Sequence, residues 1–303
     1  MLPPDDFDPP IGVPEILEPR LRRIVAPNPS PMTYRGTNTY LIGTHDLAVI
    51  DPGPDSPDHL RAILSAVGPD QNISHILVTH THLDHSPLAR PLALRTGAPV
   101  IAFGNAQAGR SAVMTDLSRN GLSGGGEGVD VNFRADQPVA NGDIIAGSDW
   151  VLEVIHTPGH LGNHISLAWG DACLTADHVM GWASSLVSPP DGDLTDFMAS
   201  CARLSERDWR VFYPGHGAPI LAPQTRLTWL IKHRLERETA ILDVLRTGPK
   251  TASEVAKAVY IDTPSAMLPA ATRNVLAHLI DLMGKSRVAA LGPLGEHTRF
   301  RHL

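Results

Sequence analysis

Four side chains that can coordinate a metal ion lie within six consecutive residues of this chain; they are His80, His82, Asp84 and His85. Neutral imidazoles combined with a carboxylate suit zinc, and they also suit iron or manganese. The run follows the apolar stretch 76–78, which is typical of a buried strand. We therefore expect a metal-binding loop at the carboxyl end of a strand, where a rigid sheet positions the ligands.

Three later residues are placed in the same way, each just after an apolar stretch; they are His160, Asp177 and His216. Taken singly, each would pass for an ordinary residue of a Gly- or Pro-containing turn. Together with the loop 80–85 they make a set of five histidines and two aspartates. Four ligands so close in sequence cannot easily all reach one ion, so the pattern favours two adjacent metal ions.

Two metal ions about 3.5–4 Å apart can share a water molecule and lower its pKa to about 7. The chain has no GxSxG serine elbow, no CxxC pair and no P-loop. We therefore predict metal-dependent hydrolysis, in which a hydroxide that bridges two divalent metal ions attacks the substrate. Zinc is the first choice of metal, with iron or manganese as alternatives, and Asp84 is predicted to be both a ligand and the catalytic proton acceptor.

The elements that must carry these residues are short and numerous. Apolar runs between turns predict strands at 40–42, 47–50, 76–78, 100–103, 144–146, 151–155, 165–169, 172–174 and 211–213. Helical spacing predicts helices at 58–67, 87–95 and 194–204. Many short strands mixed with helices indicate the α/β or α+β class.

Two loops are candidates for holding substrate over the metals. The segment 121–128 is so rich in glycine that it predicts a mobile loop, and 181–193 follows Asp177 closely. In the second loop, Trp182, Ser184 and Ser185 are the candidate contacts. His164 has two open interpretations, a hydrogen-bond partner behind a ligand or a surface histidine.

The charge distribution divides the chain in two. Residues 222–303 carry 12 Lys and Arg against 7 Asp and Glu, a net charge of +5, whereas residues 1–221 carry 13 against 25, a net charge of −12. We predict a hydrolase domain at 1–221 and a second domain at 222–303.

The second domain has the pattern of a winged helix. A long amphipathic helix is predicted at 224–245, a short one at 252–259 with Thr251 and Glu254 in a capping box, and a third at 266–283. Two strands at 287–291 and 297–301 close the domain as a hairpin. Three helices followed by a hairpin are typical of a winged helix.

Composition excludes several classes of protein. With 303 residues, 42% hydrophobic and 19% charged, the chain can bury a sizeable core, so it is neither disordered nor a coiled coil. The net charge of −7 argues against a chain that coats nucleic acid all over. Two cysteines exclude a disulfide framework. The acidic N-terminus and the lack of an 18-residue apolar run predict a cytoplasmic protein that does not span a membrane.

The order and spacing of the seven candidate ligands resemble those of the metallo-β-lactamase superfamily. The segments 36–42 (GTNTYLI) and 51–53 (DPG) are also similar to the first strands of that family. The resemblance implies an αββα sandwich with a two-metal site at one edge of its sheets. By position it assigns His80, His82 and His160 to one metal, Asp84, His85 and His216 to the other, Asp177 as the bridge, and Asp51 as support behind the ligands.

The C-terminal part is similar to the lactamase-beta-like branch, which includes an endoribonuclease for single-stranded RNA as well as thioesterase-like members. We expect hydrolysis of an ester or thioester in a small-molecule or acyl substrate, since this needs no basic surface. The alternative is single-strand-specific cleavage of RNA, which the net charge of +5 would favour. A remote alternative is a non-enzymatic, DNA-binding winged-helix protein. A homodimer through the helix 224–245 is also predicted.

Overall fold

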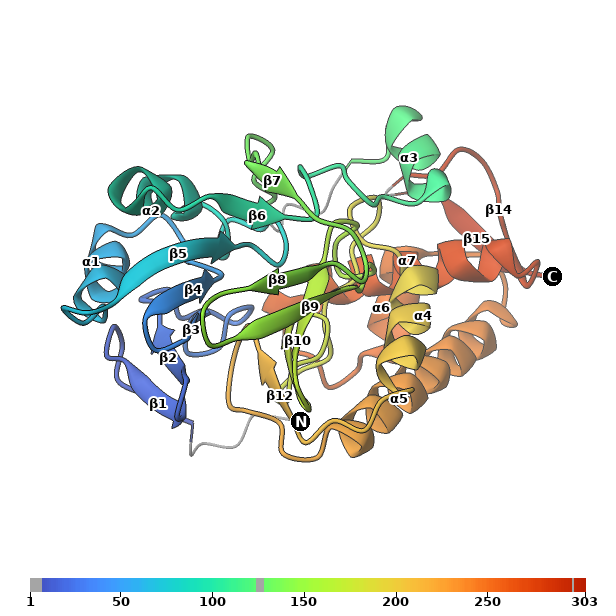
Figure 1. The fold of residues 1–303 in the computed structure, drawn as a ribbon. Coiled ribbons are helices and arrows are strands. Elements are labelled where there is room, and N and C mark those ends of the chain that lie inside the picture. The colour runs from blue at the N-terminus through green and yellow to red at the C-terminus, as the bar shows by residue number, and fades with distance from the viewer. Residues whose placement is uncertain (1–6, 124–127, 296) are drawn as a thin grey trace.

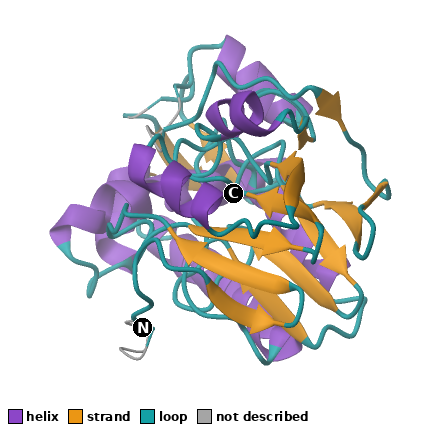
Figure 2. Cartoon of the chain, turned by 60° about the vertical axis from the view of Figure 1, so that its left-hand side comes forward, coloured by secondary structure: helices purple, strands orange, loops and turns teal. Residues whose placement is uncertain are grey.

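The computed structural model describes residues 7–123, 128–295 and 297–303 (Figure 1). The centre of the predicted loop 121–128 therefore lies outside the described residues. Most of the described chain forms two packed β-sheets with helices on both outer faces, as Figure 2 shows from a second side.

The first sheet has the strand order β1-β2-β3-β4-β5-β6-β7. Its members are β1 (Glu15–Glu18), β2 (Leu21–Val25), β3 (Asn38–Ile42), β4 (Asp46–Ile50), β5 (Asn72–Leu77), β6 (Val100–Ala102) and β7 (Gln137–Pro138). The strands from β1 to β4 pair antiparallel, and those from β4 to β7 pair parallel. The parallel strands bring the carboxyl ends of β4 and β5 to one edge of the sheet.

The second sheet has the order β12-β11-β10-β9-β8. Its members are β8 (Ile144–Ala146), β9 (Val151–His156), β10 (Ile165–Trp169), β11 (Ala172–Ala176) and β12 (Val211–Pro214). Only the β11–β12 pair is parallel among these, so β11 and β12 also end at the same edge.

Three apolar cores follow from this layering. One lies between the sheets and joins Tyr40 and Ile50 to Val154 and Leu174. A second lies beneath α1 (Pro57–Ser65) and α2 (Ala89–Thr96) on the first sheet, and a third beneath α4 (Leu194–Leu204) and α5 (Pro223–Leu245) on the second. The expected αββα sandwich is thereby confirmed.

The C-terminal part is a winged helix, as predicted. It contains α6 (Ala252–Val259), a 3₁₀ turn (Ser265–Met267), α7 (Leu268–Gly284) and a sheet of β13 (Lys250–Thr251), β15 (Arg299–His302) and β14 (Val288–Ala290). Thr251 and Glu254 form the predicted capping box at the start of α6. The apolar faces of α6 and α7 bury Val255, Val275 and Leu279 in a core of their own.

Helix α5 contributes to two cores. Leu227 and Leu230, in its first half, pack in the core under the second sheet, whereas Ile241 and Leu245, in its second half, pack in the winged-helix core. Met114 of α3 (Ala112–Arg119) also joins the winged-helix core. The two-sheet body and the winged helix are therefore packed against each other through α3 and α5.

The sequence did not predict β1, β2, β7, β13 and α3. The first two strands carry Glu15, Glu18 and the pair Arg22-Arg23, which hide their apolar alternation, and β7 is only two residues long. Helix α3 lies just before the glycine-rich segment that dominated the interpretation of this region. Among the described residues, no helix is both long and apolar enough to cross a membrane.

Candidate metal centre

All seven predicted ligands lie at the edge where β4, β5, β11 and β12 end. Asp51 follows β4 directly, the loop 80–85 follows β5, Asp177 follows β11, and His216 lies two residues after β12. His160 sits in the turn that joins β9 to β10. Asp51 and Ala176 both have left-handed backbone conformations, with φ of 50° and 41°. Such strain in residues other than glycine is typical of functional sites.

The first group of donor atoms consists of imidazole nitrogens from His80, His82 and His160. The Nδ1 atom of His82 lies 3.0 Å from Nε2 of His80 and 3.0 Å from Nε2 of His160. All three side chains are buried, and the three nitrogens lie within 4.8 Å of one another. This is the set that the family resemblance assigned to one metal ion.

The second group consists of Asp84, His85 and His216. The Oδ2 atom of Asp84 lies 3.3 Å from Nε2 of His85 and 3.2 Å from Nε2 of His216. Asp84 is the most accessible of the seven, with 24% of its side chain exposed, whereas both histidines are buried. This set also matches the predicted assignment.

The carboxylate of Asp177 lies between the two groups. Its Oδ2 atom is 3.6 Å from Nε2 of His160 in the first group and 3.3 Å from Nε2 of His216 in the second. Its Oδ1 atom is 3.5 Å from Nε2 of His85. The position agrees with the bridging role that the resemblance gives to this residue.

Hydrogen bonds on the outer sides of the rings show that these donors suit a cation. The Nδ1 atom of His160 faces the carbonyl oxygen of Leu186 at 2.7 Å, and that of His216 faces the carbonyl of Gly36 at 3.2 Å. A carbonyl only accepts, so Nδ1 carries a proton in each ring, and in the neutral imidazole Nε2 presents its lone pair to the centre. Buried lone pairs that converge without a donor between them are costly unless a cation binds there.

The same inference holds for His80 and His85. The hydroxyl of Thr79 donates to Asp51, at 2.7 Å, so its oxygen is left to accept from Nδ1 of His80 at 3.0 Å. Nδ1 of His85 donates to the carboxylate of Asp51 at 2.9 Å. Among the described residues, Nε2 of His85 and Oδ1 of Asp177 are buried without a hydrogen-bond partner. Imidazole and carboxylate donors in this arrangement fit two divalent metal ions.

The two groups differ in their electrostatics. Burial, together with the neighbouring His160, lowers the pKa of His82 to about 3, so this ring is neutral and free to ligate. Burial also lowers the pKa of His216, but the carboxylates of Asp177 and Asp84 outweigh it and raise that pKa to about 10. The second group therefore already attracts positive charge, whereas the first relies on neutral imidazoles.

The second group is held by residues of the first sheet. Asp51 is buried and accepts from His85 and from both the backbone nitrogen and the hydroxyl of Thr79. The hydroxyl of Thr37 donates to Asp84 at 3.2 Å, and Thr37 also pairs with His216 in a β-bridge. The predicted support by Asp51 is thus seen in the structure, whereas Thr37 carried no signal in the sequence.

Position 215 requires glycine because other atoms lie close to it, not because of its backbone angle. A Cβ atom at this position would lie 2.2 Å from Oδ1 of Asp177 and 2.9 Å from Cε1 of His85. Real Cβ atoms do not approach other atoms so closely, so any side chain here would displace ligands of both groups.

Three other predicted residues have roles that the structure makes specific. His164 is fully buried, so the surface interpretation is wrong; its Nδ1 bonds Thr157, and its ring lies 5.0 Å from that of His80. Ser185 is also buried, and its hydroxyl donates to the backbone carbonyls of Asp177 and His178, so it does not face a substrate. Trp182 stacks on Tyr34 with 5.2 Å between ring centroids.

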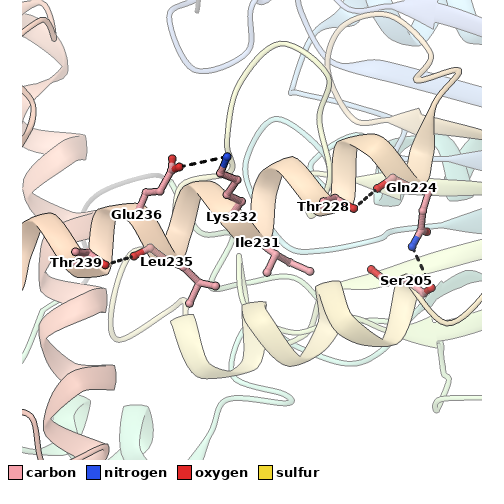
Figure 3. A pocket seen from close by; sticks show the side chains of 8 residues that line it. All are labelled: Ser205, Gln224, Thr228, Ile231, Lys232, Leu235, Glu236 and Thr239. Atoms are coloured by element: carbon pink, nitrogen blue, oxygen red, sulfur yellow. Dashed lines mark hydrogen bonds and ion pairs between the residues drawn. The ribbon is translucent and has the colours of Figure 1, made fainter.

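A groove of about 530 Å³ runs along the outer face of α5 (Figure 3). Its lining residues, at the end of α4 and along α5, are Ser205, Gln224, Thr228, Ile231, Lys232, Leu235, Glu236 and Thr239. None of them is a predicted ligand, so the groove is separate from the candidate metal centre. The predicted homodimer through this helix stays a prediction.

Comparison with known proteins agrees with this fold and site. Residues 32–216 match the metallo-beta-lactamase superfamily, and residues 251–293 match the beta-lactamase-associated winged helix domain. The beta-lactamase-like protein 2 homolog of Drosophila melanogaster is 30% identical over 283 residues, which cover 88% of this chain and 89% of that protein. An atrochrysone carboxyl ACP thioesterase of Cryptosporiopsis sp. is 28% identical over 241 residues, or 78% of this chain and 66% of the thioesterase.

Among solved structures, a beta-lactamase domain protein from Burkholderia ambifaria has the same fold. It superimposes with a TM-score of 0.81 at 20% identity and covers 99% of this chain and 96% of its own. The chain therefore belongs to the metallo-beta-lactamase superfamily, as a hydrolase with an associated winged helix domain. The alternative of a non-enzymatic DNA-binding protein is set aside on this ground.

Proposed function

We propose that this chain hydrolyses an ester or thioester bond in an acyl or small-molecule substrate, with the help of two divalent metal ions. The observation that carries the proposal is the position of Asp177, whose carboxylate lies within 3.3–3.6 Å of ring nitrogens from both donor groups. One carboxylate between two sets of three donors suits a pair of ions better than a single one. Zinc is the cation we expect, since it accepts both imidazole and carboxylate ligands.

His80, His82 and His160 would hold one ion, Asp84, His85 and His216 would hold the other, and Asp177 would bridge them. When bound, such a pair of ions makes a water molecule nucleophilic at neutral pH and polarises the bond that is cleaved. The protein itself contributes fixed ligand orientations through the outer hydrogen bonds described above, which raise ligand basicity and reduce rearrangement.

Asp84 is the residue we propose as catalytic proton acceptor. It is the most exposed of the seven, and its Oδ2 atom lies close to both histidines of the second group. The hydroxyl of Thr37 donates to the same oxygen and fixes its direction. A carboxylate at the accessible side of the centre is placed to take a proton from the reacting water and to pass it to the leaving group.

Two observations favour an acyl substrate over RNA. The similarity to an atrochrysone carboxyl ACP thioesterase supports thioester chemistry. Several positive charges of the C-terminal part are also directed inward or paired. Arg226 and Arg234 donate to backbone carbonyls of the hydrolase body, and Lys285 pairs with Glu238 and Asp281. RNA cleavage remains the second candidate, because the net charge of residues 222–303 is +5.

The test is an activity panel on metal-loaded protein with a thioester, an ester, a lactone and single-stranded RNA. The double variant His82→Ala/Asp84→Ala, which removes one donor from each group, is the control and should be inactive on every substrate. Turnover of the thioester or ester that depends on these residues supports the proposal. RNA cleavage lost in the double variant, without acyl hydrolysis, would replace it with the second candidate. Absence of bound metal after supplementation would refute both.

A further inference from the structure

Residues 180–189 run from the bridging aspartate towards α4, and we call them the strap. On one side the strap contacts the ligands. The carbonyl oxygen of Leu186 accepts from Nδ1 of His160 at 2.7 Å, and the hydroxyl of Ser185 donates to the backbone carbonyl of Asp177. Two neighbouring strap residues thus orient one ligand of the first group and the residue between the groups.

On the other side the strap is held by helices of the C-terminal part. The guanidinium of Arg234, on α5, donates to the carbonyl oxygen of Ser185. The side-chain oxygen of Asn274, on α7, accepts from the backbone nitrogen of Val187 at 3.0 Å and from Arg234 at 3.1 Å. Both partners of Asn274 are donors, so the direction of its amide is fixed.

Further contacts continue along the strap. Arg226 of α5 donates to the carbonyl oxygens of Met180, at 2.7 Å, and Ala183, at 2.6 Å. Arg273 of α7 donates to the hydroxyl of Ser188 at 3.0 Å. The strap is therefore attached to α5 and α7 at both its ends and in the middle.

The contact between Arg234 and Ser185 is buried, and the contacts of Asn274, Arg226 and Arg273 with the strap are partly buried. Arg234 is only 2% exposed and lies over the ring of Phe197, with 5.0 Å between the guanidinium carbon and the ring centroid. Ser185 and Val187 are fully buried. Polar groups in such surroundings are costly when left without partners, so the network admits few alternative arrangements.

We propose that Asn274 and Arg234 are positioning residues of the metal centre, which act through the strap to fix the orientation of His160 and the location of Asp177. The inference rests on the proposed dinuclear function. According to this proposal, α5 and the winged helix domain help to position the ligands of the metal centre. Asn274 touches neither a ligand nor the substrate side of the centre, so its effect on metal binding passes through Val187 and Leu186.

The experiment compares variants of the full-length chain by competition between the protein and a chromogenic chelator for Zn²⁺, together with elemental analysis of bound metal. Asn274→Ala removes the shared acceptor, whereas Asn274→Asp retains an acceptor oxygen in the same place. Arg237→Ala is the matched control. Arg237 lies three residues after Arg234 on α5, but it contacts Val259 and Tyr260 instead of the strap. His160→Ala removes a ligand of the first group, so the metal-binding step that this variant loses is the binding of an ion to that group.

We expect Asn274→Ala to weaken that step by about 10- to 100-fold, the usual cost of losing a partner behind a metal ligand. Asn274→Asp should restore wild-type affinity, and Arg237→Ala should not alter it. The inference would be overturned if Asn274→Ala bound both metal ions with wild-type affinity. An equal loss in both steps, shared by Arg237→Ala, would also overturn it, since this would indicate general destabilisation.

Should Asn274→Ala fail to fold, Ser185→Ala takes its place, because it removes a single oxygen atom between the strap and Asp177. Because Asp177 lies between the two groups, weaker metal binding in Ser185→Ala that Arg237→Ala does not share supports the inference, and unchanged binding overturns it. Failure of the proposed function would look different: either the wild-type protein would bind no metal, or it would bind metal without hydrolysing the thioester or ester.

Discussion

The two halves of the candidate metal centre are supported from different parts of the chain. Behind the second group stand Asp51, Thr37 and the carbonyl of Gly36, all from the first sheet and its connections. Behind the first group stands the strap, which is itself held by Arg234 and Asn274. One half is thus built by the hydrolase body alone, and the other also needs the helices that follow it.

The largest effect is expected from removing one ligand of each half separately. His160→Ala and His216→Ala should each reduce bound metal from two equivalents to one, and lower hydrolytic activity by more than the roughly 100-fold cost of losing an outer partner. Elemental analysis and initial rates on the preferred substrate measure both quantities. Loss of both ions in either single variant would show that the halves do not bind metal independently.

Gly215→Ala should disturb both halves at once. Its Cβ atom would meet Asp177 and His85, so we expect a loss of about 1–3 kcal/mol in the free energy of unfolding and weaker binding in both steps. The control is Gly284→Ala, at the end of α7, where no atom lies within 4 Å of the added methyl group. That change should leave metal binding intact and stabilise the fold by about 0.4–1 kcal/mol. Denaturant unfolding and chelator competition distinguish the two.

Asp51→Asn is the counterpart of Asn274→Ala on the other half. The amide would retain an acceptor for the backbone nitrogen of Thr79, but it replaces the carboxylate oxygen that accepts from His85 and from the hydroxyl of Thr79. We expect the binding step lost in His216→Ala to weaken by about 10- to 100-fold, and the step lost in His160→Ala to weaken less, because Thr79 reaches the first group only through His80. If Asp51→Asn and Asn274→Ala mainly weaken the binding of the same metal ion, the two donor groups are not supported by separate parts of the chain.

The smallest effect is expected for Thr251→Ala, which removes the capping box of α6. Loss of such a cap costs about 1 kcal/mol of stability. Thr251 has no contact with the strap, so metal affinity should stay at the wild-type value. Thermal unfolding with and without metal measures the first effect, and chelator competition the second. A drop in metal affinity here would mean that any destabilisation of the winged helix reaches the centre.

The sequence could predict the donor set, because the ligands follow apolar strands and four of them occupy one loop. The supporting role of Asp51 was predicted from the resemblance to the metallo-β-lactamase superfamily, and the residue directly follows β4. The strap and its supports could not be predicted in this way. Arg234 and Asn274 lie 49 and 87 residues from their partners Ser185 and Val187, and nothing about an Asn within an apolar helix indicates where its amide points. Contacts that form only when the two-sheet part and the C-terminal helices pack together produce no periodic pattern in the sequence of either part.

Helix α5 has a consequence for how the molecule loses its structure. Its 23 residues extend over about 35 Å and place Leu227 and Leu230 in one core, and Ile241 and Leu245 in another. Fraying from its first residues would expose the core under the second sheet, and fraying from its last residues the winged-helix core, so unfolding of the whole helix would open both. A chain cut at residue 221 would leave the second sheet with an uncovered apolar face, and a fragment from 222 onwards would carry the matching face of α5 into water. The two parts are therefore expected to unfold in one cooperative transition rather than to melt as independent modules.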